Sequence, residues 1–161
     1  MRKNAIAFAV GLCGLLWQSA QAQGLPKVSD IVDDSISLRN EVKDLNDRVF
    51  YAIQTGKYVE LTEQCSSMES KRDSYMKSFL SNKAYNYFSN NRPKSYKEQY
   101  LYSALISLKE GMQYRIQAVY FICKTDGVER TVLASAMGQL SAAYNAGHNA
   151  ELWAELADMQ K

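Results

Sequence analysis

Residues 28–54 read VSDIVDDSISLRNEVKDLNDRVFYAIQ, and this stretch sets the fold class. Its apolar residues recur at steps of three and four, so they form one stripe of a helix, while acidic residues occupy the opposite face. Gly56 follows, and glycine ends helices readily because it adopts the left-handed conformation without steric cost. The pattern therefore predicts an amphipathic helix over about 28–54. Its stripe, interrupted only at Ser35, consists of Val28, Ile31, Leu38, Val42, Leu45 and Val49.

The same periodicity continues along the chain, and alternating strand-like runs are scarce. Further helices are predicted over about 57–89, 95–124 and 128–145, with a short last helix over 149–159. In the predicted 128–145 helix, the side chains expected to face inward are Leu133, Met137, Leu140 and Tyr144. Pro93, the turn at Asp126-Gly127 and the sequence Asn145-Ala146-Gly147 mark the breaks. Ser95 and Glu98 form a capping box at the start of the 95–124 helix. The expected fold is an all-α, up-down helical bundle.

The first 22 residues have the three parts of a cleavable secretory signal peptide. Arg2 and Lys3 supply the positive charge, residues 5–17 are apolar, and Ala20 and Ala22 form the small-residue cleavage pattern. This apolar run is shorter than the roughly 20 residues that span a bilayer, which disfavours the alternative of an uncleaved anchor. We expect cleavage before Gln23, a single helical domain over 23–161, and a periplasmic or secreted location. The absence of an N-x-[ST] sequon favours the bacterial periplasm.

Cleavage changes the charge of the protein. The full chain has 19 basic and 17 acidic residues, and the loss of Arg2 and Lys3 leaves 17 of each in the mature chain. A formally neutral protein lacks the basic excess that nucleic-acid binding requires, so no nucleic-acid partner is expected.

Cys65 and Cys123 are the cysteines that remain in the mature chain, and an even pair in an exported protein predicts a disulfide. Two unrelated buried thiols are the alternative. In an antiparallel hairpin, residues at equal distances from the turn face each other, and the midpoint of this pair falls beside Pro93. The disulfide therefore predicts that the 57–89 and 95–124 helices form one long hairpin, stapled at its open end. If the first of them ended at residue 80, Cys65 would lie roughly 18 Å from Cys123, too far for a disulfide.

Residue types that carry catalysis are sparse. His148 is the only histidine, and the chain contains no phosphate-binding, zinc-protease or serine-hydrolase motif. His148 and Glu151 have the spacing of half a metal site, but one histidine cannot complete a di-iron bundle. No catalytic residue, cofactor or metal is therefore expected, and a small envelope enzyme or cofactor carrier remains the alternative.

Charge is distributed unevenly along the chain. Residues 23–69 contain 5 basic and 9 acidic residues, whereas residues 70–124 contain 10 basic and 3 acidic ones and most of the tyrosines. Aromatic and basic residues are typical anchors of protein interfaces. One interpretation is therefore a basic-aromatic hairpin end that binds an acidic partner protein, an anionic glycan or a membrane surface. The other is that this segment packs against the acidic first helix of the same molecule. The candidate partner-binding residues are Lys83, Tyr85, Tyr87, Phe88, Arg92, Lys94, Tyr96 and Lys97.

Together these features predict an exported, non-enzymatic interaction protein. An inhibitor or immunity protein and an adaptor of a secretion or pilus assembly both fit, and a protein partner in the cell envelope is expected. The export signal followed by the 28–54 helix resembles helical periplasmic components of conjugation and type IV secretion systems. That likeness extends over the first helix and includes no distinctive motif.

Overall fold

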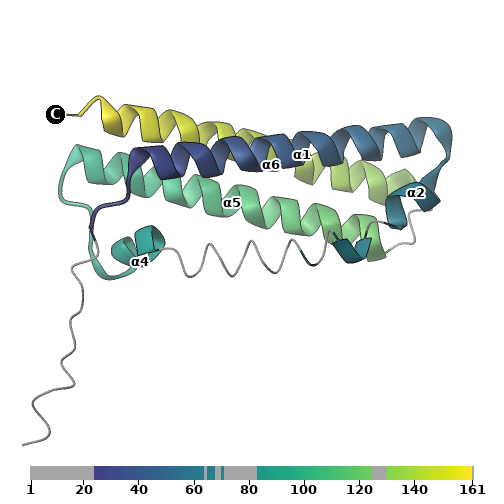
Figure 1. Cartoon of the computed structure of the whole chain (residues 1–161), viewed down its shortest axis with the longest axis horizontal. Coiled ribbons are helices and arrows are strands. Elements are labelled where there is room, and N and C mark those ends of the chain that lie inside the picture. Colours follow the sequence, from purple (N-terminus) through teal and green to yellow (C-terminus); the bar gives the residue numbers. More distant parts are fainter. Residues whose placement is uncertain (1–23, 64, 68–69, 71–82, 125–129, 161) are drawn as a thin grey trace, which may run out of the picture.

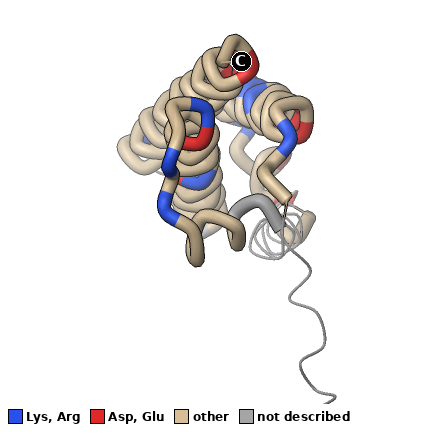
Figure 2. The backbone as a smooth tube through the Cα atoms, turned by 90° about the vertical axis from the view of Figure 1, so that its left-hand side faces the viewer, with Lys and Arg blue, Asp and Glu red and all other residues tan. Residues whose placement is uncertain are grey.

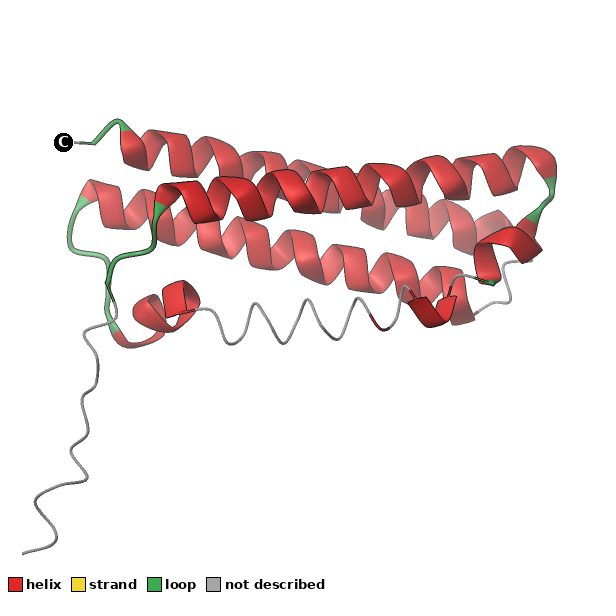
Figure 3. Ribbon diagram, in the orientation of Figure 1, coloured by secondary structure: helices red, strands yellow, loops and turns green. Residues whose placement is uncertain are grey.

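The computed structural model describes residues 24–63, 65–67, 70, 83–124 and 130–160. Within these ranges every regular element is a helix (Figure 3), which confirms the predicted all-α class. The elements are α1 (Val28–Thr55), α2 (Tyr58–Thr62), α4 (Lys83–Asn90), α5 (Tyr96–Lys124) and α6 (Arg130–Asp158). None of the described helices combines the length and apolar character needed to cross a membrane.

The three long helices α1, α5 and α6 lie side by side (Figure 1). The most extensive contacts join α6 to α5 and α6 to α1, so the last helix is the centre of the packing. The start of α1, the start of α5, α4 and the end of α6 lie at one end of the bundle, and α2 lies at the other. This arrangement confirms the bundle architecture and defines two ends that a partner could approach.

The α1 helix follows its predicted pattern closely. Its apolar stripe is buried from Ile31 to Val49, and Ser35, the polar gap in that stripe, is fully buried as well. The Ser35 hydroxyl donates to the carbonyl oxygen of Ile31 at 2.6 Å, which satisfies the buried oxygen inside its own helix. Gly56 ends the helix in the left-handed conformation, with φ of 70°, and its N–H donates to Ala52.

The capping box at the start of α5 is present in a modified form. The backbone N–H of Glu98 donates to the Ser95 hydroxyl at 3.2 Å, as predicted. The Glu98 carboxylate accepts a hydrogen bond from the N–H of Lys94, one residue before the expected donor. Both interactions satisfy free backbone donors at the helix start and hold the preceding turn against α5.

The prediction of a break at residues 145–147 and a separate helix over 149–159 is wrong, because α6 continues without interruption to Asp158. Gly147 is buried in the middle of this helix, where a Cβ atom would lie 2.9 Å from Cγ of Arg39 on α1. Because Gly147 has no side chain, α1 and α6 can approach closely at this position. The glycine does not end α6. The inward position expected for Tyr144 is also wrong, since that ring is 41% exposed. The buried face of α6 consists largely of small residues, namely Ala136, Ala143, Ala146, Gly147, Ala150, Ala154 and Ala157.

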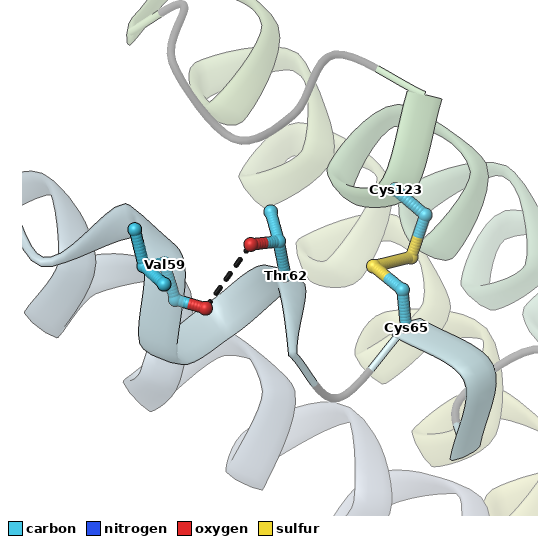
Figure 4. Close-up of a disulfide and its surroundings, with 4 residues drawn as sticks. All are labelled: Val59, Thr62, Cys65 and Cys123. Carbon is cyan, nitrogen blue, oxygen red and sulfur yellow. Dashed lines mark hydrogen bonds between the residues drawn. A yellow bond between two sulfur atoms is a disulfide. The ribbon is translucent and has the colours of Figure 1, made fainter.

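The predicted disulfide is confirmed, since Cys65 is bonded to Cys123 on the last turn of α5 (Figure 4). In the turn just before it, the Thr62 hydroxyl donates to the carbonyl oxygen of Val59 at 3.0 Å. At the other end of the predicted hairpin, the ring of Phe88 on α4 packs edge-on against Tyr102 of α5, with centroids 5.6 Å apart. The Cys65–Cys123 and Phe88–Tyr102 pairs both have midpoints near residues 94–95, as a single antiparallel hairpin requires. The predicted 57–89 helix is not continuous, because α2 ends at Thr62 and Glu63 lies in a turn. Residues 64, 68–69 and 71–82 of that prediction, like the signal peptide 1–22, lie outside the described residues.

Candidate functional site

The predicted hairpin-end residues divide into a buried and an exposed group. Phe88 is only 9% exposed and belongs to the small apolar cluster at this end, where Tyr87 packs edge-on against it. Arg92, Lys94 and Tyr96 are exposed, and Tyr96 reaches 71%. Lys97 is partly exposed, and the side chains of Lys83 and Tyr85 lie outside the described part of the structure. The exposed members therefore come from the turn before α5 and its first residue.

Part of the positive charge of residues 70–124 is paired with acidic residues of the same molecule. Arg115 of α5 is almost fully buried, and its guanidinium lies 3.0 Å from the carboxylate of Glu41 on the acidic helix α1. This pair is the internal complementarity that one interpretation of the sequence expects. Arg92 and Lys94, by contrast, form no ion pair with any described residue and leave their charge at the surface.

The last turns of α6 carry exposed apolar side chains that the sequence did not mark as a site. Leu152 is 45% exposed, Leu156 38% and Met159 71%. Trp153, 37% exposed, stacks on Tyr100 of α5 with ring centroids 5.8 Å apart. They are exposed because alanines occupy the core-facing positions of the same turns, leaving the large residues on the outer side.

These two groups are neighbours. Tyr100 lies one turn after Tyr96 on α5, so its stack on Trp153 places the start of α5 beside the end of α6. Figure 2 views this end of the bundle, with Lys and Arg on the turn that leads into α5 and Asp and Glu at the end of α6. We call this region the end surface. It comprises Arg92, Lys94, Tyr96, Leu152, Trp153, Leu156 and Met159.

In the described ranges, no three His, Cys, Asp or Glu side chains are grouped closely enough to hold a metal ion. The exposed His148 has its Nδ1 atom 3.9 Å from the Glu151 carboxylate. That carboxylate is already bound by Arg39 of α1 at 2.6 Å, and the Arg39 guanidinium also lies over the Tyr144 ring. The sole histidine of the chain therefore borders a structural ion pair between α1 and α6.

A cleft of about 280 Å³ lies at the opposite end of the bundle, between α1 and α2. Three of its charged lining residues form ion pairs with close neighbours: Lys57 with Glu60 at 3.2 Å, and Arg48 with Asp44 at 2.8 Å. Hydrogen bonds that the Lys57 ammonium group donates to Glu60 and Tyr51 raise the pKa of Lys57.

The sequence matches no protein-family model, no curated protein and no solved structure.

Proposed function

We propose that this chain is an exported, non-enzymatic interaction protein of the bacterial cell envelope, and that it binds a protein partner through the end surface. The signal-peptide pattern supports export. The disulfide is compatible with an oxidising compartment such as the periplasm.

The observation that carries the proposal is the group of exposed apolar side chains at one end. Tyr96, Leu152, Trp153, Leu156 and Met159 each expose more than a third of their surface, and they occupy adjacent turns of two packed helices. Single exposed apolar residues are normal in soluble proteins, but a contiguous group rimmed by charge is typical of an interaction site. Trp, Tyr and Met, which the group contains, are residue types enriched in interfaces.

Affinity capture from envelope extracts tests the proposal. The mature wild-type protein should capture one or more envelope proteins, and a Trp153→Ser/Met159→Ser variant should lose them. Val59→Ser is the matched control, because Val59 is 67% exposed at the opposite end of the bundle. Circular dichroism should show equal helix content in all three proteins.

Three results count against the proposal. Equal capture by the end-surface variant and the control would show that the end surface is not the binding site. Binding to anionic vesicles or glycans without any protein partner would reassign the function. Turnover of a substrate by the purified protein would contradict the non-enzymatic assignment.

A further inference from the structure

We infer that the partner of the end surface is a second copy of this chain, so that the protein forms a two-fold symmetric dimer. The inference rests on the proposed function and names the partner. It follows from the order of charges across the surface.

The apolar centre of the end surface is bordered by opposite charges on its two sides. On the α5 side, the turn before the helix supplies exposed Arg92 and Lys94, which we call the basic edge. On the α6 side, exposed Glu155 and Asp158 form the acidic edge. In the described part of the chain none of these four side chains takes part in an ion pair, so each is available to a partner.

Helix geometry places the acidic edge away from α5. Trp153 points toward α5, because it stacks on Tyr100. Glu155 lies two positions later, which is about 200° around the helix at 3.6 residues per turn. By the same helical repeat, Leu152 and Leu156 project into the arc between these two directions. The order across the surface is therefore basic edge, Tyr96 and Trp153, the α6 apolar residues, and acidic edge.

A surface with this order is complementary to itself. A two-fold axis through the apolar centre places the basic edge of each copy against the acidic edge of the other, and it buries the two apolar centres together. A uniformly acidic protein or an anionic membrane would meet the basic edge favourably but would be repelled by Glu155 and Asp158. The charge order thus favours a second copy over those occupants.

Sedimentation equilibrium of the mature, disulfide-bonded chain tests this inference. We expect a concentration-dependent dimer that weakens as salt is added, because its edges are charged. The basic-edge variant Arg92→Glu/Lys94→Glu and the acidic-edge variant Glu155→Lys/Asp158→Lys should each dimerise at least tenfold more weakly than wild type. Val59→Ser should dimerise like wild type.

Mixing the two charge variants gives the sharpest result. In a mixture, the two edges of one variant are acidic and the two edges of the other carry the substituted or native basic residues, so the two variants should form a 1:1 heterodimer at wild-type strength or better. A wild-type protein that remains monomeric up to about 1 mM, the weakest range of measurable affinity, would overturn the inference. Homodimers unaffected by either charge variant, or a mixture that fails to associate, would also overturn it.

Failure of this inference is distinguishable from failure of the proposed function. A monomeric wild type that still captures another envelope protein through Trp153 and Met159 would leave the proposed function standing and remove self-association. A monomer that captures nothing would remove both.

Discussion

The Cδ2 atom of Leu38 on α1 lies 2.8 Å from the position that a Cβ atom would occupy on Gly111 of α5. The same Leu38 atom lies 3.6 Å from the corresponding position on Gly147 of α6. One fully buried leucine thus fills the space that two glycines leave on the two neighbouring helices. The closeness of the three helices at the middle of the bundle depends on this arrangement.

Replacing Gly111 with alanine should destabilise the protein. The added methyl group would meet Leu38 and the backbone oxygen of Ala143, which lies 3.1 Å away and cannot move without shifting α6. Overpacking of this kind costs about 1–3 kcal/mol of unfolding free energy. Gly138→Ala on α6 is the control, because nothing lies within 4 Å of its Cβ position. That change should stabilise the protein by about 1 kcal/mol through helix propensity. Urea unfolding measures both, and equal effects would contradict the packing argument.

Removal of the disulfide should lower stability substantially. Cys65 and Cys123 are 58 residues apart, and closing a loop of that length stabilises a fold by about 4 kcal/mol on the chain-entropy model. We expect Cys65→Ser/Cys123→Ser to lose up to that amount in urea unfolding. Reduced wild-type protein should unfold at nearly the same urea concentration as the variant. A variant as stable as the oxidised wild type would show that the bond constrains little.

The ion pair between Arg39 and Glu151 should contribute more than an exposed pair on the same helix. Both side chains are about four-fifths buried, with relative exposures of 21% and 18%, and they join α1 to α6. Glu151→Ala should cost about 1–2 kcal/mol, since it leaves a mostly buried guanidinium without this partner. Asp44→Ala, which removes the exposed Arg48–Asp44 pair, should cost less than about 0.5 kcal/mol of pair energy. Double-mutant cycles with Arg39→Ala and Arg48→Ala isolate the two pair energies, and similar values would refute the ranking.

The environment of Asp34 should make the stability of the protein depend on pH. Burial, followed by the nearby charges of Asp30 and Asp33, raises the pKa of Asp34 above its usual value of 3.8. A raised pKa means that the folded state disfavours the ionised carboxylate. The resulting loss of folding stability is complete above the pKa of Asp34 in the folded protein, and it vanishes below 3.8. Asp34→Asn should therefore raise the Tm by about 1–2 °C at pH 7, because the site is half exposed and the effect is screened. The gain should shrink as the pH falls toward 3.8. A gain that is constant with pH would contradict this cause.

Export makes a prediction about mass. If residues 1–22 are a signal peptide, intact mass spectrometry of protein from the periplasm should show a chain that begins at Gln23. Ala20→Asp/Ala22→Asp should block cleavage and leave the full-length chain in the membrane fraction. Full-length wild-type protein in the membrane would instead support an uncleaved anchor.

Much of the fold was predictable because large apolar residues mark the core faces of α1 and α5. The predicted 28–54 and 95–124 helices agree with the observed bounds to within one residue. The disulfide followed from cysteine parity alone. The apolar periodicity of these two helices is a local signal, and their packing in the bundle preserves it.

The end of the chain was harder to predict, for a physical reason. Glycine at a helix terminus and glycine at a close helix contact look identical in a single sequence, and Gly147 is the second kind. A seven-residue repeat of alanine at 136, 143, 150 and 157 passes through the supposed break, and it would have indicated one continuous helix. Because that face is built from small residues, size does not identify the core side of α6. For the same reason, the exposure of Leu152, Leu156 and Met159 could not be inferred.

Part of the candidate site was predictable. The turn before α5 and Tyr96 were identified from charge and aromatic content, and they are exposed. Phe88 has the same composition signal but is buried, because its burial depends on which residues of α5 the hairpin brings opposite it. Neighbours in space that are more than 50 residues apart in sequence, such as Tyr100 and Trp153, have no signature in one sequence.

The packing of α1 against α6 also bears on the order of events during export. The first helix to leave a translocation channel is the one whose main partner, α6, leaves last, about 100 residues later. If the chain is exported as proposed, its apolar stripe would remain uncovered until nearly the whole chain has crossed the membrane. Folding would then be completed after translocation, and chaperones that hold unfolded chains would meet α1 during that interval.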